Sequence, residues 1–326
     1  MPDITLVEAV TQALAYELEH DKNVVVFGED VGKNGGVFRA TQGLQARFGE
    51  RRVFDTPLAE SMIAGLAIGM SLQGLKPVAE FQFMGFIYPA MNQIISHAAR
   101  MRNRTRGRLH CPLVFRAPFG GGIRAPEHHS ESTEALFAHI PGLQVVIPSS
   151  PKRAYGLLLA AMRNPDPVIF LEPKRIYRLV KQPVADDGNA LPLGKCFTLK
   201  VGEDVTLVSW GASLHETLQA AQQLTDEGLS VEVIDVATIK PLDIETILQS
   251  VEKTGRCVII HEGAKTCGIG AEISAQIMEN SMEFLSAPVQ RVTGYDTVMP
   301  YFQLEKYYIP SVTRIKASVM HVMEST

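Results

Sequence analysis

Apolar and polar positions follow two alternating patterns along the chain. Residues 6–18 carry apolar side chains at helical spacing, and Thr5 with Glu8 has the spacing of a capping box, which together predict an amphipathic helix. The next apolar run, residues 24–27, is short, β-branched and uninterrupted. Such runs are typical of strands that are buried on both faces of a parallel sheet.

The same alternation continues through two blocks of the chain. In the first block it predicts helices over residues 57–73, 87–102 and 152–162 and strands over residues 78–81, 113–115, 145–147 and 168–171. In the second block it predicts strands over residues 205–210, 231–234, 258–260 and 289–292, helices capped by Ser213 and Asp243, and a helix after Gly268 and Gly270. We therefore predict an α/β fold with two doubly wound domains.

Residues 183–198 separate the two blocks. Proline, glycine and aspartate break any period there, as is typical of an interdomain linker. The predicted domains accordingly span residues 1–182 and 199–326. A chain of 326 residues is long enough for two such domains.

Composition and charge exclude several classes of function. A net charge of −4 argues against a nucleic-acid partner, and no apolar run approaches the ~20 residues that cross a membrane. The four cysteines form no C-x-x-C pair, and the chain starts without a signal segment or an Arg-rich presequence. We expect a bacterial, cytoplasmic protein in a reducing compartment.

Five arginines stand close together between the predicted helix at residues 87–102 and the strand that follows. We interpret them as a solvated helix end or as a contact with an acidic partner surface, with phosphate binding as the alternative. They are Arg100, Arg102, Arg104, Arg106 and Arg108.

Polar residues follow three strands of the first block, where ligand sites of open α/β sheets lie. They are Glu29 and Asp30, residues 82–86, and residues 120–131, which include three consecutive glycines and two histidines. Their convergence predicts an active site at this edge of the sheet.

Glu60 and His129 are the residues best suited to move protons in such a site. Glu60 has mostly small or apolar neighbours, and a carboxyl group in a dry setting has a raised pKa. The alternative is a first-turn glutamate that complements a helix dipole. His129 and His128 follow the glycines in a long loop, as acid–base groups or as solvated loop histidines, and no further zinc ligands stand at suitable spacing.

Two other patterns allow both a structural and a ligand-binding interpretation. Phe81, Phe83 and Phe86 either pack in the core or form an aromatic wall for a flat heterocycle. Gly268 and Gly270 are a weak dinucleotide fingerprint, because the third glycine is missing, and this disfavours a self-contained NAD oxidoreductase. The chain also lacks a P-loop, a G-x-S-x-G elbow, and the Gly-Asp-Gly segment with later paired asparagines that holds magnesium and diphosphate in thiamin enzymes.

The chain resembles the beta subunits of the thiamin-diphosphate-dependent decarboxylase component of 2-oxoacid dehydrogenase complexes. The resemblance covers essentially the whole chain and is carried by residues 54–60 (FDTPLAE), 80–83 (EFQF), 116–122 (RAPFGGG), 129–132 (HSES), 145–148 (VVIP), 240–243 (KPLD) and 294–297 (GYDT). It implies a pyrimidine-binding domain followed by a transketolase-type C-terminal domain. It also implies a heterotetramer of two alpha and two beta chains, in which the alpha chain supplies the missing magnesium-diphosphate motif, and a lipoylated acyltransferase core that accepts the acyl group.

The resemblance also implies roles for single residues. Glu60 would hydrogen-bond the aminopyrimidine of thiamin diphosphate and favour the imino tautomer that takes the proton from the thiazolium carbon. His129 would donate or accept a proton near the substrate carbonyl and the lipoyl group. Phe86 would pack against the pyrimidine, Glu29, Leu58, Ala59 and Gln82 would line its pocket, and Phe83, Met84, Gly85 and Phe86 would border the substrate.

Some members of this family bind a structural potassium ion in the beta subunit. The matching positions here are Leu113, Ala161, Met162, Asn164 and Asp166. The family commonly has aspartate at the position of Asn164 and asparagine at that of Asp166, so the swap keeps one carboxylate at the candidate site.

Three segments bear on the choice of substrate. Residues 137–139, 172–174 and 294–297 are more similar to branched-chain 2-oxoacid enzymes than to pyruvate enzymes. We therefore expect oxidative decarboxylation of a branched-chain 2-oxoacid, with pyruvate and then acetoin as alternatives, since one or two methylenes are worth only ~1–3 kcal/mol. A non-catalytic scaffold subunit, which only docks the alpha chain and the acyltransferase core, is the alternative of a different class.

Overall fold

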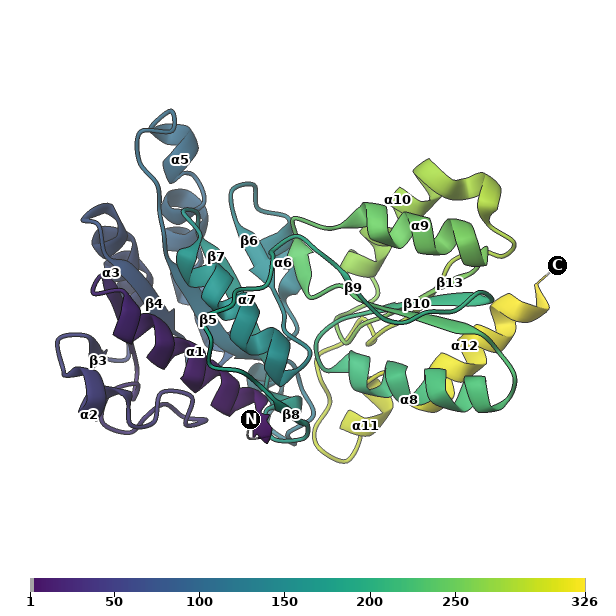
Figure 1. Cartoon of the computed structure of the whole chain (residues 1–326), viewed down its shortest axis with the longest axis horizontal. Helices are drawn as coiled ribbons and strands as arrows, with labels where there is room; N and C mark the ends of the chain where they lie inside the picture. The colour runs from purple at the N-terminus through teal and green to yellow at the C-terminus, as the bar shows by residue number, and fades with distance from the viewer. Residues whose placement is uncertain (1–2, 326) are drawn as a thin grey trace. The chain divides into compact units, whose positions relative to one another are not determined.

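The computed structural model describes residues 3–325 and divides into two compact units (Figure 1). The first unit runs from the start of the described chain to Phe119 and includes Leu136–Leu193. The second comprises Gly120–Ala135 and the chain from Gly194 onward. Each unit contains an α/β sheet with its own buried core, as the alternating pattern predicts.

Six parallel strands form the sheet of the first unit, in the order β6-β7-β5-β4-β2-β3. Strand β2 is buried along its whole length, and its Val26 lies between Val53 of β3 and Val78 of β4. Burial on both faces explains why these strands are apolar throughout. The strands are β2 (Val24–Gly28), β3 (Val53–Asp55), β4 (Lys76–Glu80), β5 (Val114–Phe119), β6 (Gln144–Val146) and β7 (Val168–Pro173).

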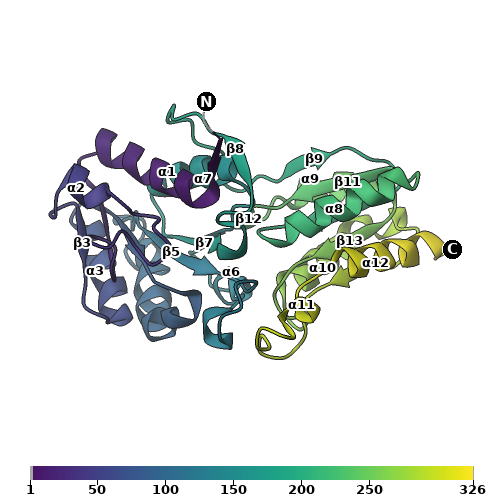
Figure 2. The ribbon, with the colours of Figure 1, turned by 90° about the horizontal axis from the view of Figure 1, so that it is seen from below.

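Helices α1 (Leu6–His20) and α7 (Pro151–Arg163) lie side by side on one face of this sheet, and α3 (Glu60–Leu72) packs against β4 on the other (Figures 1 and 2). The predicted capping box of α1 is confirmed: the Thr5 amide donates to Glu8 Oε2 at 2.7 Å, and the Glu8 amide donates to Thr5 Oγ1 at 3.4 Å. The remaining elements of this part of the chain are α2 (Leu44–Phe48), α6 (Glu134–Ala138), η4 (Lys174–Ile176) and the antiparallel pair β1 (Asp3–Thr5) and β8 (Lys181–Pro183).

The prediction of a single helix over residues 87–102 is wrong. The structure has a succession of short turns there, and Pro89 lies inside the first of them. Proline has no amide hydrogen to donate and its ring clashes with the preceding turn, so a regular α-helix does not form across it. The turns are η1 (Met84–Ala90), α4 (Met91–Gln93), the π-helical η2 (Ile94–Ala98) and α5 (Met101–Arg104).

The sheet of the second unit has the order β14-β13-β10-β11-β9, in which β9 is antiparallel to β11 and the other pairs are parallel. Helices α8 (Ser213–Asp226) and α12 (Val312–Glu324) cover one face, and α9 (Ile244–Thr254) and α10 (Ile269–Ser281) cover the other (Figures 1 and 2). The strands are β9 (Phe197–Lys200), β10 (Val205–Ser209), β11 (Val231–Asp235), β13 (Cys257–Ile260) and β14 (Gln290–Val292), and the shorter elements are η3 (Glu127–His129), β12 (Thr238–Lys240), η5 (Met282–Phe284) and α11 (Glu305–Tyr308).

Two caps in the second unit differ from the prediction. Ser213 is not the cap of α8 but its first residue, since Ala212 occupies the cap position and no side chain bonds there. Asp243 does occupy the cap position of α9, yet its carboxylate accepts from Thr246 Oγ1 at 2.8 Å and from the Cys196 amide at 3.1 Å. Helix α12, which the sequence interpretation omitted, begins with a true cap, in which Ser311 Oγ accepts from the Arg314 amide.

Residues 120–135 belong to the second unit, whereas the sequence interpretation placed them in the first. Two buried carboxylates of the second unit, on Glu262 and Glu305, accept hydrogen bonds from this segment's backbone amides. Across residues 3–325, no helix has both the length and the apolar character needed to cross a membrane.

A buried ion cluster joins three central strands of the first unit. Arg116 of β5 is 1% exposed and forms two hydrogen bonds with Glu172 of β7, from Nε at 2.7 Å and from Nη2 at 2.9 Å. Its Nη1 donates to Glu80 of β4, and the Tyr177 hydroxyl donates to Glu172 at 2.5 Å. A guanidinium that satisfies two buried carboxylates at once is costly to remove, because their charges would then be left without compensation.

We predict that Arg116→Met lowers the free energy of unfolding by roughly 3–5 kcal/mol, because both Glu80 and Glu172 would be left buried without their partner. Arg47→Met is the matched control, since the Arg47–Glu19 pair is exposed on both sides and such pairs contribute at most about 1 kcal/mol. Urea unfolding of the two variants measures the difference. Equal losses of stability would contradict the central role of Arg116.

Candidate active site

Glu29 follows β2 directly and is almost fully buried, with 7% of its surface exposed. Gly28 makes this position possible, because a Cβ at Gly28 would lie 2.4 Å from the Glu80 carbonyl oxygen. Burial raises the pKa of Glu29, and the neighbouring charges of Glu60 and Asp30 raise it further. Its Oε1 is buried and has no hydrogen-bond partner among residues 3–325, so it can take a donor from a ligand.

Asp30 and Gln82 lie together beside Glu29, as expected from the ends of β2 and β4. Gln82 Nε2 donates to Asp30 Oδ2 at 2.9 Å, and Asn34 Nδ2 donates to Asp30 Oδ1 at 2.8 Å. The structure therefore gives Gln82 a second role, which is to fix the loop that follows Glu29.

Aromatic rings form a group next to this strand edge. Phe83 and Phe86 meet edge to face with centroids 5.6 Å apart, and Phe38 meets Phe83 in the same way at 5.4 Å. Phe83 and Phe86 are half-buried, whereas Met84 and Gly85 are buried. The two phenylalanines thus supply the accessible part of the predicted aromatic wall, and Phe81, 1% exposed, packs in the core.

Glu60 is the first residue of α3, and Ala59 occupies the cap position without a side-chain hydrogen bond. The neighbours of Glu60 are apolar, as the sequence shows, but they do not form the dry setting that we expected. Leu58 is 79% exposed and Met62 is 42% exposed, so the start of α3 presents apolar side chains at the surface of this chain. Glu60 lies close enough to Glu29 for its charge to raise the pKa of the Glu29 carboxyl group.

His129 lies in the second unit, at the end of the short turn η3, and is half-buried, whereas His128 is exposed. The glycines before it do allow a close approach, but in this structure the approaching groups are carboxylates of the chain itself. Gly120 and Gly122 have φ of 79° and 87°, and a Cβ at Gly120 would lie 2.9 Å from Glu262 Oε1. Glycine is the residue that reaches this left-handed conformation at little cost.

The second unit contains a buried cluster of Trp210, His261 and Glu134 that was not predicted from the sequence. Trp210 stacks on His261 with ring centroids 5.0 Å apart, and its Nε1 donates to Glu134 at 3.3 Å. Burial raises the pKa of Glu134 to about 7 and lowers the pKa of His261 to about 3. Both groups are therefore held largely in their neutral forms around pH 6.

Gly268 and Gly270 lie against this cluster. A Cβ at Gly268 or at Gly270 would lie 2.8 Å from the His261 ring. Both glycines thus leave room for the buried imidazole, which explains the weak fingerprint in the sequence.

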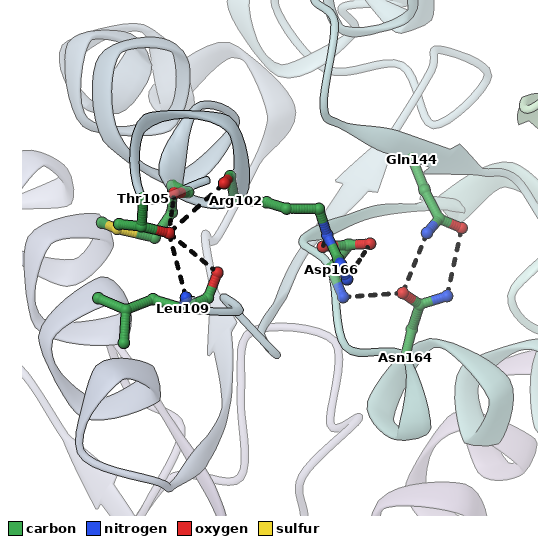
Figure 3. A network of polar contacts seen from close by, with 7 residues as sticks. Arg102, Thr105, Leu109, Gln144, Asn164 and Asp166 are labelled. Carbon is green, nitrogen blue, oxygen red and sulfur yellow. Dashed lines mark hydrogen bonds and ion pairs between the residues drawn. The ribbon is translucent and has the colours of Figure 1, made fainter. Parts of the chain in front are cut away.

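The side chains at the predicted potassium site are already paired with each other and with their neighbours (Figure 3). Asp166 binds Arg102 through two hydrogen bonds, from Nε at 2.7 Å and from Nη2 at 2.9 Å. Asn164 Oδ1 accepts from Gln144 Nε2 at 3.0 Å and from the Asp166 amide at 2.9 Å. A guanidinium therefore neutralises the one carboxylate that a cation would need.

The backbone carbonyls at two other predicted potassium positions also accept hydrogen bonds within the chain. The Leu113 carbonyl accepts from the Val168 amide at 3.0 Å, the Ala161 carbonyl accepts from the Asn164 amide at 3.2 Å, and Met162 is buried. The potassium site remains a prediction from the resemblance, and we propose no role for that ion.

The five clustered arginines are all exposed, from the cap position of α5 to the residues that follow the helix. Arg102 binds Asp166, and Arg104 Nη2 donates to the Ser96 carbonyl at 2.7 Å. This placement is that of a solvated helix end, and two members of the cluster serve the local structure.

Comparisons with known proteins agree on the family of the chain. Residues 3–180 match the model of the transketolase pyrimidine-binding domain, and residues 194–315 match that of the transketolase C-terminal domain. The chain is 51% identical to the pyruvate dehydrogenase E1 component subunit beta of Acholeplasma laidlawii, over 98% of each chain, and 48% identical to that of Bacillus subtilis (strain 168), over 99% of this chain and 100% of the relative. A solved split-gene transketolase, described as an inactive beta4 tetramer, matches 99% of each chain with a TM-score of 0.82 and 25% identity.

We predict that Glu134→Gln changes how stability depends on pH. The folded chain keeps a proton on Glu134 up to a pKa of about 7, whereas the ordinary value is 4.5, so wild-type stability is lost as pH rises between these values. Relative to Glu134→Gln, the wild type should lose roughly 2–3 kcal/mol between pH 5 and pH 8. Urea unfolding at both pH values measures this, and taking the difference between the proteins cancels the contribution of His261.

Glu279→Gln is the control for this measurement, because Glu279 is exposed on α10. It should follow the wild type at both pH values. If Glu134→Gln also followed the wild type, the proton on Glu134 would not contribute to folding.

Proposed function

Because the chain belongs to the beta subunits of the E1 component of 2-oxoacid dehydrogenases, we propose that it holds the pyrimidine half of a thiamin-diphosphate site and takes part in the oxidative decarboxylation of pyruvate. The observation that carries this proposal is Glu29: a buried carboxyl group with a raised pKa and an oxygen without a partner within the described chain, close to Glu60. Such a pair of groups suits a heterocycle that offers ring and amino nitrogens.

The residues at the strand edge fit an aminopyrimidine. Phe83 and Phe86 supply a half-buried aromatic surface for a flat ring, and the unpartnered Glu29 oxygen can accept from its nitrogens. When bound, thiamin diphosphate supplies a carbon nucleophile and an electron sink for the loss of carbon dioxide. The protein contributes position, burial and proton transfer.

We assign Glu60 to the ring nitrogen of the pyrimidine. Its place in the first turn of α3 fixes its backbone, and its charge already acts on Glu29. We expect Glu60 to hold or release the proton at that nitrogen, beside Glu29, whose pKa is raised by burial.

The surface around Glu60 supports a site that is shared with a partner. Leu58 and Met62 are large apolar side chains exposed beside the carboxylate, and the chain lacks the magnesium-diphosphate motif of thiamin enzymes. An alpha subunit that covers this surface would bury Glu60 and supply the magnesium ligands. The related split-gene transketolase, inactive as a beta4 tetramer, is consistent with this division of the site between chains.

His129 is our candidate for proton transfer to the substrate and to the incoming lipoyl group of the acyltransferase core. A half-buried histidine in a glycine-rich loop keeps its ring reachable for a substrate. This role comes from the resemblance, and the hydrogen bonds that fix the loop support it.

Pyruvate replaces the branched-chain substrate of the sequence interpretation. The similar proteins named above are described as pyruvate dehydrogenase subunits, and their similarity spans nearly the whole chain. The short segments that suggested branched-chain substrates weigh less than this. Because one or two methylenes change selectivity by only ~1–3 kcal/mol, such segments alone do not decide the substrate.

We predict that Glu60→Gln, assembled with a matching alpha chain, lowers turnover of pyruvate by at least about 100-fold, because a neutral amide cannot exchange the proton. Its thermal unfolding temperature should stay within a few degrees of that of the wild type, since Glu60 is only half-buried in this chain. Glu50→Gln is the control, because Glu50 is exposed. Asp55 is not suitable for this purpose, since its carboxylate accepts a hydrogen bond from the Gly32 amide.

The same assembly, given pyruvate, 2-oxoisovalerate and acetoin in turn, identifies the substrate by kcat/KM. A preference for 2-oxoisovalerate would contradict the pyruvate assignment while leaving the family intact. Near wild-type turnover of Glu60→Gln would favour the scaffold interpretation.

A further inference from the structure

Two buried glutamates of the second unit hold the loop that carries His129. Glu262 Oε1 accepts from the Gly121 amide at 2.5 Å and from Ser132 Oγ at 2.9 Å. Glu305 accepts from the Gly122 amide through Oε1 at 2.6 Å and from the Arg124 amide through Oε2 at 3.2 Å. The anchored positions therefore lie on both sides of His129 in the sequence.

These carboxylates are buried, with Glu262 6% exposed and Glu305 5% exposed. Their hydrogen-bond donors are backbone amides and one hydroxyl group, and none of these carries a charge. Burying a charged carboxylate is costly, and charge-assisted hydrogen bonds to backbone amides offset that cost only while the donors keep their positions. Any displacement of the loop is opposed by the loss of these bonds.

Gly120 and Gly122 allow the loop backbone to approach these carboxylates closely. A Cβ at Gly120 would lie 2.9 Å from Glu262 Oε1, and Gly122 has a left-handed φ of 87°. The short distance and the backbone conformation together suit a carboxylate that binds the amide of the next residue, Gly121.

We propose that Glu262 and Glu305 are positioning residues for His129, on the basis of the role assigned to His129 in the proposed function. They do not touch the reacting atoms. They fix residues 121–132 so that the imidazole is presented in one place during turnover. Preorganised groups of this kind contribute to rate because the geometry is set before the reaction begins.

The two glutamates should respond differently to replacement by glutamine. Glu262 uses the single oxygen Oε1 for both of its donors, so the amide oxygen of glutamine can accept both hydrogen bonds. Glu305 uses one oxygen for each donor, so glutamine would turn its NH2 group toward one of the two amides. We therefore expect Glu262→Gln to keep the loop in place, and Glu262→Ala and Glu305→Gln to release it.

Hydrogen–deuterium exchange of the full chain tests the anchors without reference to activity. Peptides covering residues 119–133 should exchange about tenfold faster in Glu262→Ala and Glu305→Gln, because buried hydrogen bonds to a charged acceptor are lost. Glu262→Gln and the exposed control Glu279→Ala should match the wild type. Unchanged exchange in both Glu262→Ala and Glu305→Gln would overturn the proposal.

Turnover of the assembled enzyme then tests the connection to His129. Glu305→Gln should lower kcat with little change in KM for the 2-oxoacid, and adding it to His129→Ala should cause no further loss. If the losses of kcat in the two single variants instead multiplied in the double variant, the positioning role of Glu305 would be overturned, but the role of His129 would not. Wild-type turnover of His129→Ala would instead overturn the role of His129 itself, and the exchange data would still report whether the loop is anchored.

Discussion

The guanidinium of Arg116 lies between two buried carboxylates where the central strands of the first unit end, and the geometry of the strand edge depends on it. Glu80 and Glu172 come from the strands on either side of β5, so one side chain joins β4, β5 and β7. The Glu80 carbonyl lies so close to Gly28 that only glycine fits there. The position of Glu29, one residue later, therefore depends on the same cluster.

Three buried acids of the second unit are accommodated differently. Glu262 and Glu305 bind backbone amides, and burial keeps Glu134 largely protonated around pH 6. The consequence is that the segment from Gly120 to Ala135, although it follows β5 directly, has its hydrogen-bond partners in the second unit. The two proton-transfer candidates are therefore positioned in different ways. Glu60 is the first residue of helix α3, whereas the loop that carries His129 is bound by the carboxylates of Glu262 and Glu305.

Local patterns were sufficient to predict the alternation of strands and helices, the capping box at Thr5 and the polar strand ends around Glu29. Long-range partners were not predictable in this way, because Glu262 and Glu305 lie 141 and 183 residues from the amides that they bind. The same limit applies at the predicted potassium site, where Asp166 binds Arg102, which lies 64 residues away in the sequence. Pro89 and Ser311 were local signals, of a broken helix and of the cap of α12, and the sequence interpretation overlooked both.

The central claim is that this chain carries one half of a thiamin-diphosphate site. Calorimetric titration of thiamin diphosphate with magnesium, into this chain alone and into its assembly with an alpha chain, tests the claim most directly. We expect tight, stoichiometric binding by the assembly and binding at least about 100-fold weaker by the chain alone, because the diphosphate and magnesium ligands would come from the partner. Equally tight binding by the isolated chain would contradict it.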